Sequence, residues 1–167
     1  IVLSSVTLCL CISMAACDTI NTPRGGATGS LKDSPAPGDK PSDVTPSTLA
    51  SWGNKLYNEE VEQRKEKNEL ETNTSVTDQM NRIFDQLKSA ALADQEYGAV
   101  AKEMDWRLTT IRDKDIVMAT AYPGGGIAIY DGVFDVARNE GALAAILGHE
   151  MAHVLARHGL KRMAGHA

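Results

Sequence analysis

Hydrophobic positions recur with a helical period in two long stretches of the chain. The first stretch begins at residue 76, and its apolar residues form one face: Val76, Met80, Ile83, Phe84, Leu87 and Ala91. The second begins near Asn139, a good N-cap residue, and is expected to run to about Met163 and end at Gly165. Its apolar stripe comprises Leu143, Ile146, Leu147, Met151, Val154 and Leu155. Both patterns predict helices that pack against a core.

Three short runs between these helices are typical of β-strands. The runs "WRLTTI" (106–111) and "IVMATAY" (116–122) are rich in β-branched and aromatic residues, and the polar turn "RDKD" between them predicts a hairpin. The third run, "GIAIYDG" (126–132), follows "YPGGG", which predicts a tight turn or bulge and places the strand beginning at Ile127 at a sheet edge. The expected fold class is α+β, with a small antiparallel sheet packed against helices.

The N-terminal segment has the pattern of an export signal. Residues 1–17 are mostly apolar, and the segment is too short for a comfortable membrane span. Its end, "SMAAC", resembles the lipobox of bacterial lipoproteins, with Met14 where leucine is usual, so Cys17 is the candidate lipidated residue. An ordinary cleaved signal and an uncleaved anchor are the alternatives. A lipidated Cys17 predicts a bacterial cell-envelope protein that is anchored to a membrane and faces the periplasm.

Composition divides the rest of the chain into three parts. Residues 18–50 hold five of the six prolines and almost no large apolar residues, which predicts a flexible tether. Residues 51–75 are dense in alternating charge and predict a solvent-exposed helix, and residues 76–167 form the folded domain. The net charge of -5, without a basic patch, argues against a nucleic-acid partner.

The motif "HEMAH" in the last helix carries the candidate chemistry. His149 and His153 lie one helical turn and about 40° apart, so their two imidazoles can coordinate one metal ion. Glu150 lies about 100° round from His149, off the ligand face but close enough to reach a metal-bound water as a general base. Zinc fits best, because imidazole nitrogen suits it and it lowers the pKa of bound water towards about 7. The alternative is a buried helix with satisfied polar residues, but burying these three side chains without a partner is costly.

Two further histidines are weaker candidates. His158 lies about 140° round the helix from His153, which indicates a structural role or support of a ligand. His166 follows the expected helix end and is a poorly placed ligand candidate. The elongated metzincin pattern requires glycine at position 156 and histidine at position 159, whereas the chain has Ala156 and Gly159, so that class is excluded.

The segment "PGGGIAIYDGVFDVARNEGALAAILGHEMAHVLARH" (123–158) resembles the HtpX/BepA/CAAX prenyl protease family of zinc metallopeptidases, and the likeness extends over about residues 76–165. The resemblance implies a zincin-like domain that binds one zinc ion, with His149 and His153 as ligands and Glu150 as catalytic base. In that family the Pro-Gly-Gly turn leads into an edge strand that holds peptide substrate by strand addition. By position, the substrate-lining residues would be Gly125, Gly126, Ile127, Ala128, Ile129 and Tyr130.

The chain departs from this family at two points. Met118 occupies the position of a usual asparagine, and the family's third ligand, a glutamate on a later helix, is not reached before Ala167. Residues 76–167 are therefore expected to be the N-terminal part of the domain, with weak zinc affinity and little activity by themselves. The expected function is a zinc metalloendopeptidase that acts on misfolded or unassembled cell-envelope proteins. The alternatives are a catalytically weak or inactive zincin-like lipoprotein that serves as a chaperone or assembly factor, and a purely structural helical lipoprotein.

Overall fold

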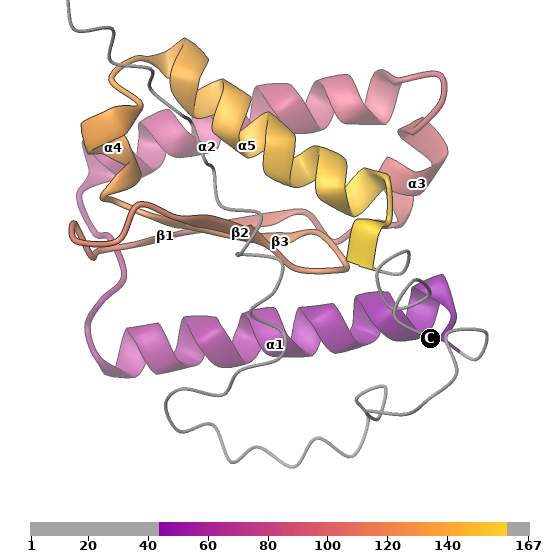
Figure 1. The fold of residues 1–167 in the computed structure, drawn as a ribbon, viewed down its shortest axis with the longest axis horizontal. Coiled ribbons are helices and arrows are strands. Elements are labelled where there is room, and N and C mark those ends of the chain that lie inside the picture. The colour runs from indigo at the N-terminus through magenta and orange to yellow at the C-terminus, as the bar shows by residue number, and fades with distance from the viewer. Residues whose placement is uncertain (1–43, 160–167) are drawn as a thin grey trace, which may run out of the picture.

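The helices of this chain lie on both faces of one small sheet (Figure 1). The structure is a computed structural model, and it describes residues 44–159. Helix α1 (Pro46–Glu66) covers one face of the sheet, and α2 (Thr74–Ala93) and α5 (Glu140–Leu155) cover the other. Two short helices, α3 (Gly98–Glu103) and α4 (Val133–Val136), lie at the ends of this second layer. The mixture of helices with a small sheet agrees with the α+β class predicted from the sequence.

The sheet has the strand order β1-β3-β2 and is mixed rather than antiparallel. Strand β3 (Gly126–Tyr130) runs parallel to β1 (Arg107–Ile111) and antiparallel to β2 (Ala119–Ala121). The predicted hairpin between 106–111 and 116–122 is therefore wrong. The reason lies in the turn at 122–125, where Gly124 and Gly125 adopt positive φ angles of 100° and 107° and reverse the chain tightly. This turn pairs β2 with β3, and the longer loop at 112–118 carries the chain to the far edge.

Strand β3 is the central strand, so the prediction of an edge strand beginning at Ile127 is also wrong. All five of its residues are buried, because neighbouring strands pair with it on both sides and helices cover both faces. The outer edge of β1 is also paired at its C-terminal end: the N–H of Glu71 donates to the carbonyl of Thr110 over 3.0 Å, and the N–H of Arg112 donates to the carbonyl of Glu69 over 2.6 Å. Within residues 44–159, β2 is thus the edge of the sheet without a neighbouring strand.

Helix α1 differs in extent and in role from the predicted charged helix at 51–75. It begins at Pro46, inside the predicted tether, because proline fits the first helical position and the Thr45 side chain accepts a hydrogen bond from the Thr48 N–H. It ends at Glu66, and α2 then begins at Thr74. One face of α1 is not solvent-exposed but packs on the sheet through its buried residues Leu49, Gly53 and Tyr57.

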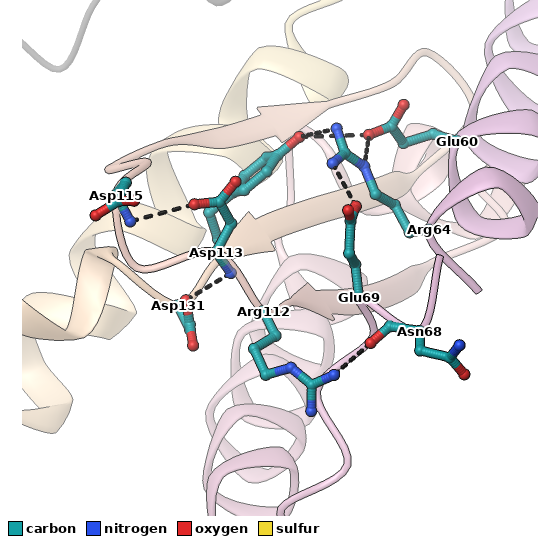
Figure 2. A network of polar contacts seen from close by, with 9 residues as sticks. Glu60, Arg64, Asn68, Glu69, Arg112, Asp113, Asp115 and Asp131 are labelled. Atoms are coloured by element: carbon teal, nitrogen blue, oxygen red, sulfur yellow. Dashed lines mark hydrogen bonds and ion pairs between the residues drawn. The ribbon is translucent and has the colours of Figure 1, made fainter. Parts of the chain in front are cut away.

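A half-buried polar network fixes the C-terminal half of α1 to the sheet. The Arg64 guanidinium donates to Glu60 Oε1 over 2.7 Å and to Glu69 Oε2 over 2.8 Å, and Figure 2 shows it between these two carboxylates. Its Nη2 also donates to the phenol oxygen of Tyr130 on β3 over 3.0 Å. Burial raises the pKa of Tyr130 to about 12, so this phenol stays neutral at physiological pH.

The helices on the other face follow the predicted periodicity. Met80, Ile83 and Phe84 of α2 are buried against the core, as expected. Helix α5 ends at Leu155, before the predicted end near Met163, because Arg157 adopts a positive φ of 51° that breaks the helix. No helix within residues 44–159 is both long and apolar enough to cross a membrane. The predicted signal peptide with Cys17, the tether up to residue 43, His166 and the helix end at Gly165 lie outside the described residues.

Candidate metal centre

Helix α5 presents the predicted site residues at the junction of its core face and its solvent face. The helix is capped as predicted, since the Asn139 side chain accepts a hydrogen bond from the Ala142 N–H over 2.9 Å. Its buried residues Leu143, Leu147, Met151 and Val154 pack into the main core. His149 is exposed and His153 is partly buried, so both imidazoles lie at the rim of that core. A buried stripe thus fixes the rotation of the helix that carries the imidazoles.

The two imidazoles converge on a common point. Their Nε2 atoms lie 2.9 Å apart, and their rings form an edge-on pair with centroids 4.5 Å apart. Tetrahedral zinc with bonds of about 2.0–2.1 Å holds two nitrogen ligands roughly 3.3 Å apart. The pair therefore needs to open by only about half an ångström to take a zinc ion. Within residues 44–159, no three side chains of His, Cys, Asp or Glu are grouped so that they could hold a metal ion.

His158 contacts one member of this pair. Its Nδ1 lies 2.6 Å from the Nδ1 of His153, and the two ring centroids are 4.9 Å apart. A hydrogen bond between these nitrogens fixes the orientation of the His153 ring, as partners of metal-ligating histidines commonly do. The position agrees with the prediction that His158 is structural or supports a ligand.

Glu150 is buried next to the imidazoles. Only 5% of its surface is exposed. Burial raises the pKa of its carboxyl from 4.5 to about 7, and a hydrogen bond from the backbone of Ala121 partly opposes this rise. A carboxyl group that titrates near neutrality can both accept and return a proton, which is the property required of a general base and acid.

The main chain of β2 lies beside this carboxyl. The Tyr130 N–H donates to the Met118 carbonyl over 2.9 Å, and the Tyr122 N–H donates to the Gly126 carbonyl over 2.8 Å. Because these main-chain groups face β3, those of the alternate residues Ala119 and Ala121 point away from β3, towards the open edge. The outer edge of β2 is therefore aligned with the glutamate of α5.

Strand addition to β3 does not fit this arrangement, and the role of Gly125–Tyr130 in lining the substrate stays a prediction. The main-chain N–H and C=O groups of β3 are hydrogen-bonded to β1 and β2, so a further strand cannot be added to β3. Sequence reasoning missed Ala119 and Ala121 because it paired their strand with the wrong neighbour. The short glycine-rich turn at 122–125 was the feature that could have identified the true hairpin.

Met118 lies on the opposite face of the sheet from Glu150. Its side chain packs with the cluster of Ile111, Ala128 and Tyr130 under α1, whereas Ala119 and Ala121 belong to the core that contains α5. The departure from the usual asparagine thus changes the packing of the α1 layer and brings no bulk to the candidate site.

Comparison with known proteins agrees with this geometry. The model of peptidase family M48 matches residues 77–167. The chain belongs to peptidase family M48. The match begins within α2 and includes the whole sheet and α5, which confirms the metallopeptidase resemblance predicted from the sequence. Helix α1 lies upstream of the matched M48 segment.

Two curated relatives are named as proteases. The chain is 37% identical over 62 residues to the mitochondrial metalloendopeptidase OMA1 of Schizosaccharomyces pombe, a match that covers 37% of this chain and 18% of that protein. It is 46% identical over 48 residues to a putative beta-barrel assembly-enhancing protease of Vibrio cholerae, a match that covers 29% of this chain and 10% of that protein. The chain thus spans less than a fifth of the length of either relative.

Proposed function

We propose that this protein is a zinc-dependent metalloendopeptidase. The observation that carries the proposal is the convergence of the His149 and His153 Nε2 atoms, 2.9 Å apart, directly beside a buried glutamate. Membership of family M48 supports the same activity. A bound zinc ion would supply Lewis-acid polarisation of the scissile carbonyl and of the attacking water.

Side chains of α5 and of the segment that follows it have separate roles in this proposal. His149 and His153 hold the ion, and His158 keeps the ring of His153 in orientation through the contact between their Nδ1 atoms. The third ligand, which the family resemblance implies on a later helix, lies outside the described residues. Glu150 takes a proton from the attacking water and passes it to the nitrogen of the leaving amine, a role supported by its pKa of about 7.

The substrate in this proposal is a peptide in extended conformation that lies along β2. The outward main-chain groups of Ala119 and the outward carbonyl of Ala121, whose N–H donates to Glu150, hydrogen-bond to it as an added strand, so binding depends little on side-chain identity. The hydrogen bond between the Ala121 backbone and Glu150 supports this placement, because it sets the strand at a fixed distance from the base.

The cellular substrates in this proposal are misfolded or unassembled proteins of the bacterial cell envelope. The relative named as a beta-barrel assembly-enhancing protease supports this class of substrate. A lipid anchor on Cys17 would hold the domain at a membrane, facing the periplasm. The chaperone or assembly-factor alternative gains nothing from Met118, because that side chain packs on the α1 face of the sheet, away from Glu150.

Cleavage of casein by the full-length, zinc-loaded protein tests the proposal. Glu150→Gln should reduce cleavage by at least about a thousandfold while zinc content stays unchanged, because the amide cannot accept the proton. Glu140→Gln is the matched control on the first turn of the same helix, where the side chain is exposed and binds Arg82. Cleavage that survives in Glu150→Gln, or that resists a chelator, would refute the assignment.

A further inference from the structure

Helix α1 is in direct contact with the turn that precedes β3. The closest approach is at Gly53: a Cβ atom placed on this residue would lie 2.0 Å from the carbonyl oxygen of Pro123 and 2.7 Å from its Cβ. No side chain of any size fits between the helix backbone and the turn. Gly53 is thus required by the close approach of two backbones, although glycine is a poor helix former.

The next residues of α1 extend this contact along the turn. A Cβ atom at Gly124 would lie 2.6 Å from Asn54 Oδ1, and this same oxygen accepts a hydrogen bond from Arg107 Nη2 over 3.0 Å. One turn later, the Tyr57 ring fills the space beside Gly126 and packs edge-on against Tyr122, with ring centroids 5.6 Å apart. Both ends of the turn are therefore held by α1.

The other side of the turn meets the segment that follows α5. A Cβ atom at Gly159 would lie 3.6 Å from Pro123 Cγ and 3.7 Å from Leu49 Cδ2, both at ordinary van der Waals distance. Pro123 thus lies between α1 and the chain just beyond the candidate metal ligands. A shift of α1 would be transmitted to the turn, and through the turn to β2, whereas the segment at Gly159 makes only van der Waals contacts that can adjust.

We propose that Gly53 and Asn54 of α1 are positioning residues that hold the 122–126 turn, and with it the outer edge of β2, in register with Glu150. The inference rests on the proposed peptidase function. If α1 positions the edge strand, the part of the chain needed for full activity begins upstream of the M48-matched segment, which starts at residue 77. The contacts predict a defect in peptide binding, rather than in metal binding, when the α1 contact is disturbed.

The test is Gly53→Ala in the full-length, zinc-loaded protein, with Ser51→Ala as the control. Ser51 is exposed on the same helix, so its change tests helix propensity alone. In an unobstructed helix, replacing glycine by alanine stabilises the folded protein by about 1 kcal/mol. Any loss of stability or activity in Gly53→Ala is therefore due to the contact with Pro123. We expect the KM for an extended peptide to rise about tenfold, with kcat and zinc content unchanged, because edge hydrogen bonds are misaligned.

Hydrogen exchange gives a second readout that does not depend on catalysis. The amides of residues 119–122 should exchange faster in Gly53→Ala than in Ser51→Ala, while those of α2 should not change. If Gly53→Ala does not fold, Asn54→Ala replaces it, since it removes the Asn54 contacts without adding bulk. Unchanged KM and unchanged exchange would overturn the proposal. A wild-type protein that binds zinc but cleaves nothing would instead overturn the proposed function. The hydrogen-exchange comparison would then test by itself whether Gly53 and Asn54 position β2.

Discussion

The carboxyl group of Glu150 accepts a hydrogen bond from the backbone of Ala121, which joins the helix of the candidate metal centre to the edge strand of the sheet. The proposed base and the strand proposed to receive a peptide are therefore joined directly. This hydrogen bond favours the charged carboxylate, whereas burial favours the neutral acid, and burial dominates.

The titration of Glu150 predicts how the stability of the metal-free protein depends on pH. The pKa of Glu150 is about 7 in the folded state against 4.5 ordinarily, so between these pH values the folded state binds a proton that the unfolded state has lost. The free energy of unfolding should then fall as pH rises through this window, by up to about 3 kcal/mol, and level off above it. Urea unfolding at a series of pH values in the presence of a chelator measures this.

Glu150→Gln provides the comparison for that measurement. Its amide does not titrate, so the decline in stability between about pH 4.5 and 7 should be absent from the variant. Wild-type and variant curves that run parallel across the window would show that Glu150 is not the group responsible.

Substitution of the histidines should separate ligands from a supporting residue. His149→Ala and His153→Ala each remove one of the converging nitrogens and should abolish stoichiometric zinc binding. His158→Ala removes only the partner of His153 Nδ1 and should weaken zinc affinity about 10- to 100-fold. Competition with a fluorescent chelator reports the affinities. Equal losses in all three variants would place His158 among the ligands.

Strand addition at β2 predicts a periodic response to ester substitution in the substrate. Replacing a peptide N–H that bonds to the outward carbonyl of Ala119 or Ala121 by an ester oxygen should raise KM about five- to tenfold. The same change one residue along the peptide affects an N–H that points away from β2 and should have little effect. A KM that responds equally at successive positions would contradict binding as an added strand.

The contact between α1 and β3 predicts a loss of stability in Tyr130→Phe. The Tyr130 phenol accepts a hydrogen bond from Arg64 and lies 3.3 Å from Glu60 Oε1. Losing these bonds to charged groups should lower the free energy of unfolding by about 1–3 kcal/mol in urea titrations. Tyr97→Phe is the control, because this tyrosine lies outside the network, just before α3. A loss no larger than that of the control would mean that the network does not hold α1 on the sheet.

Local patterns in the sequence predicted the helices of the core and the spacing of the candidate site. The buried residues Met80, Ile83 and Phe84 follow from the helical period, and the start of α5 follows from the capping group of Asn139. The convergence of His149 and His153 is also local, because their separation along one helix sets it.

The pairing of the strands could not be predicted in the same way. Both the polar turn at 112–115 and the glycine-rich turn at 122–125 are compatible with a hairpin, and the choice depends on how β3 packs between β1 and β2. The packing of α1 was missed because its charged residues outnumber its buried ones and the contact is made by Gly53 and Tyr57. Its contact with Pro123 joins residues distant in sequence, which no local periodicity encodes.

The bridge between Leu70 and Ile111 on the outer side of β1 has a consequence for self-association. Of the two edges that a three-stranded sheet offers for joining another copy of itself, this one is already paired at its C-terminal end within residues 44–159. The outer edge of β2 has no such partner within the described residues, so it is the more open edge for joining two sheets. A dimer built in that way would hide the same strand that the proposed reaction needs.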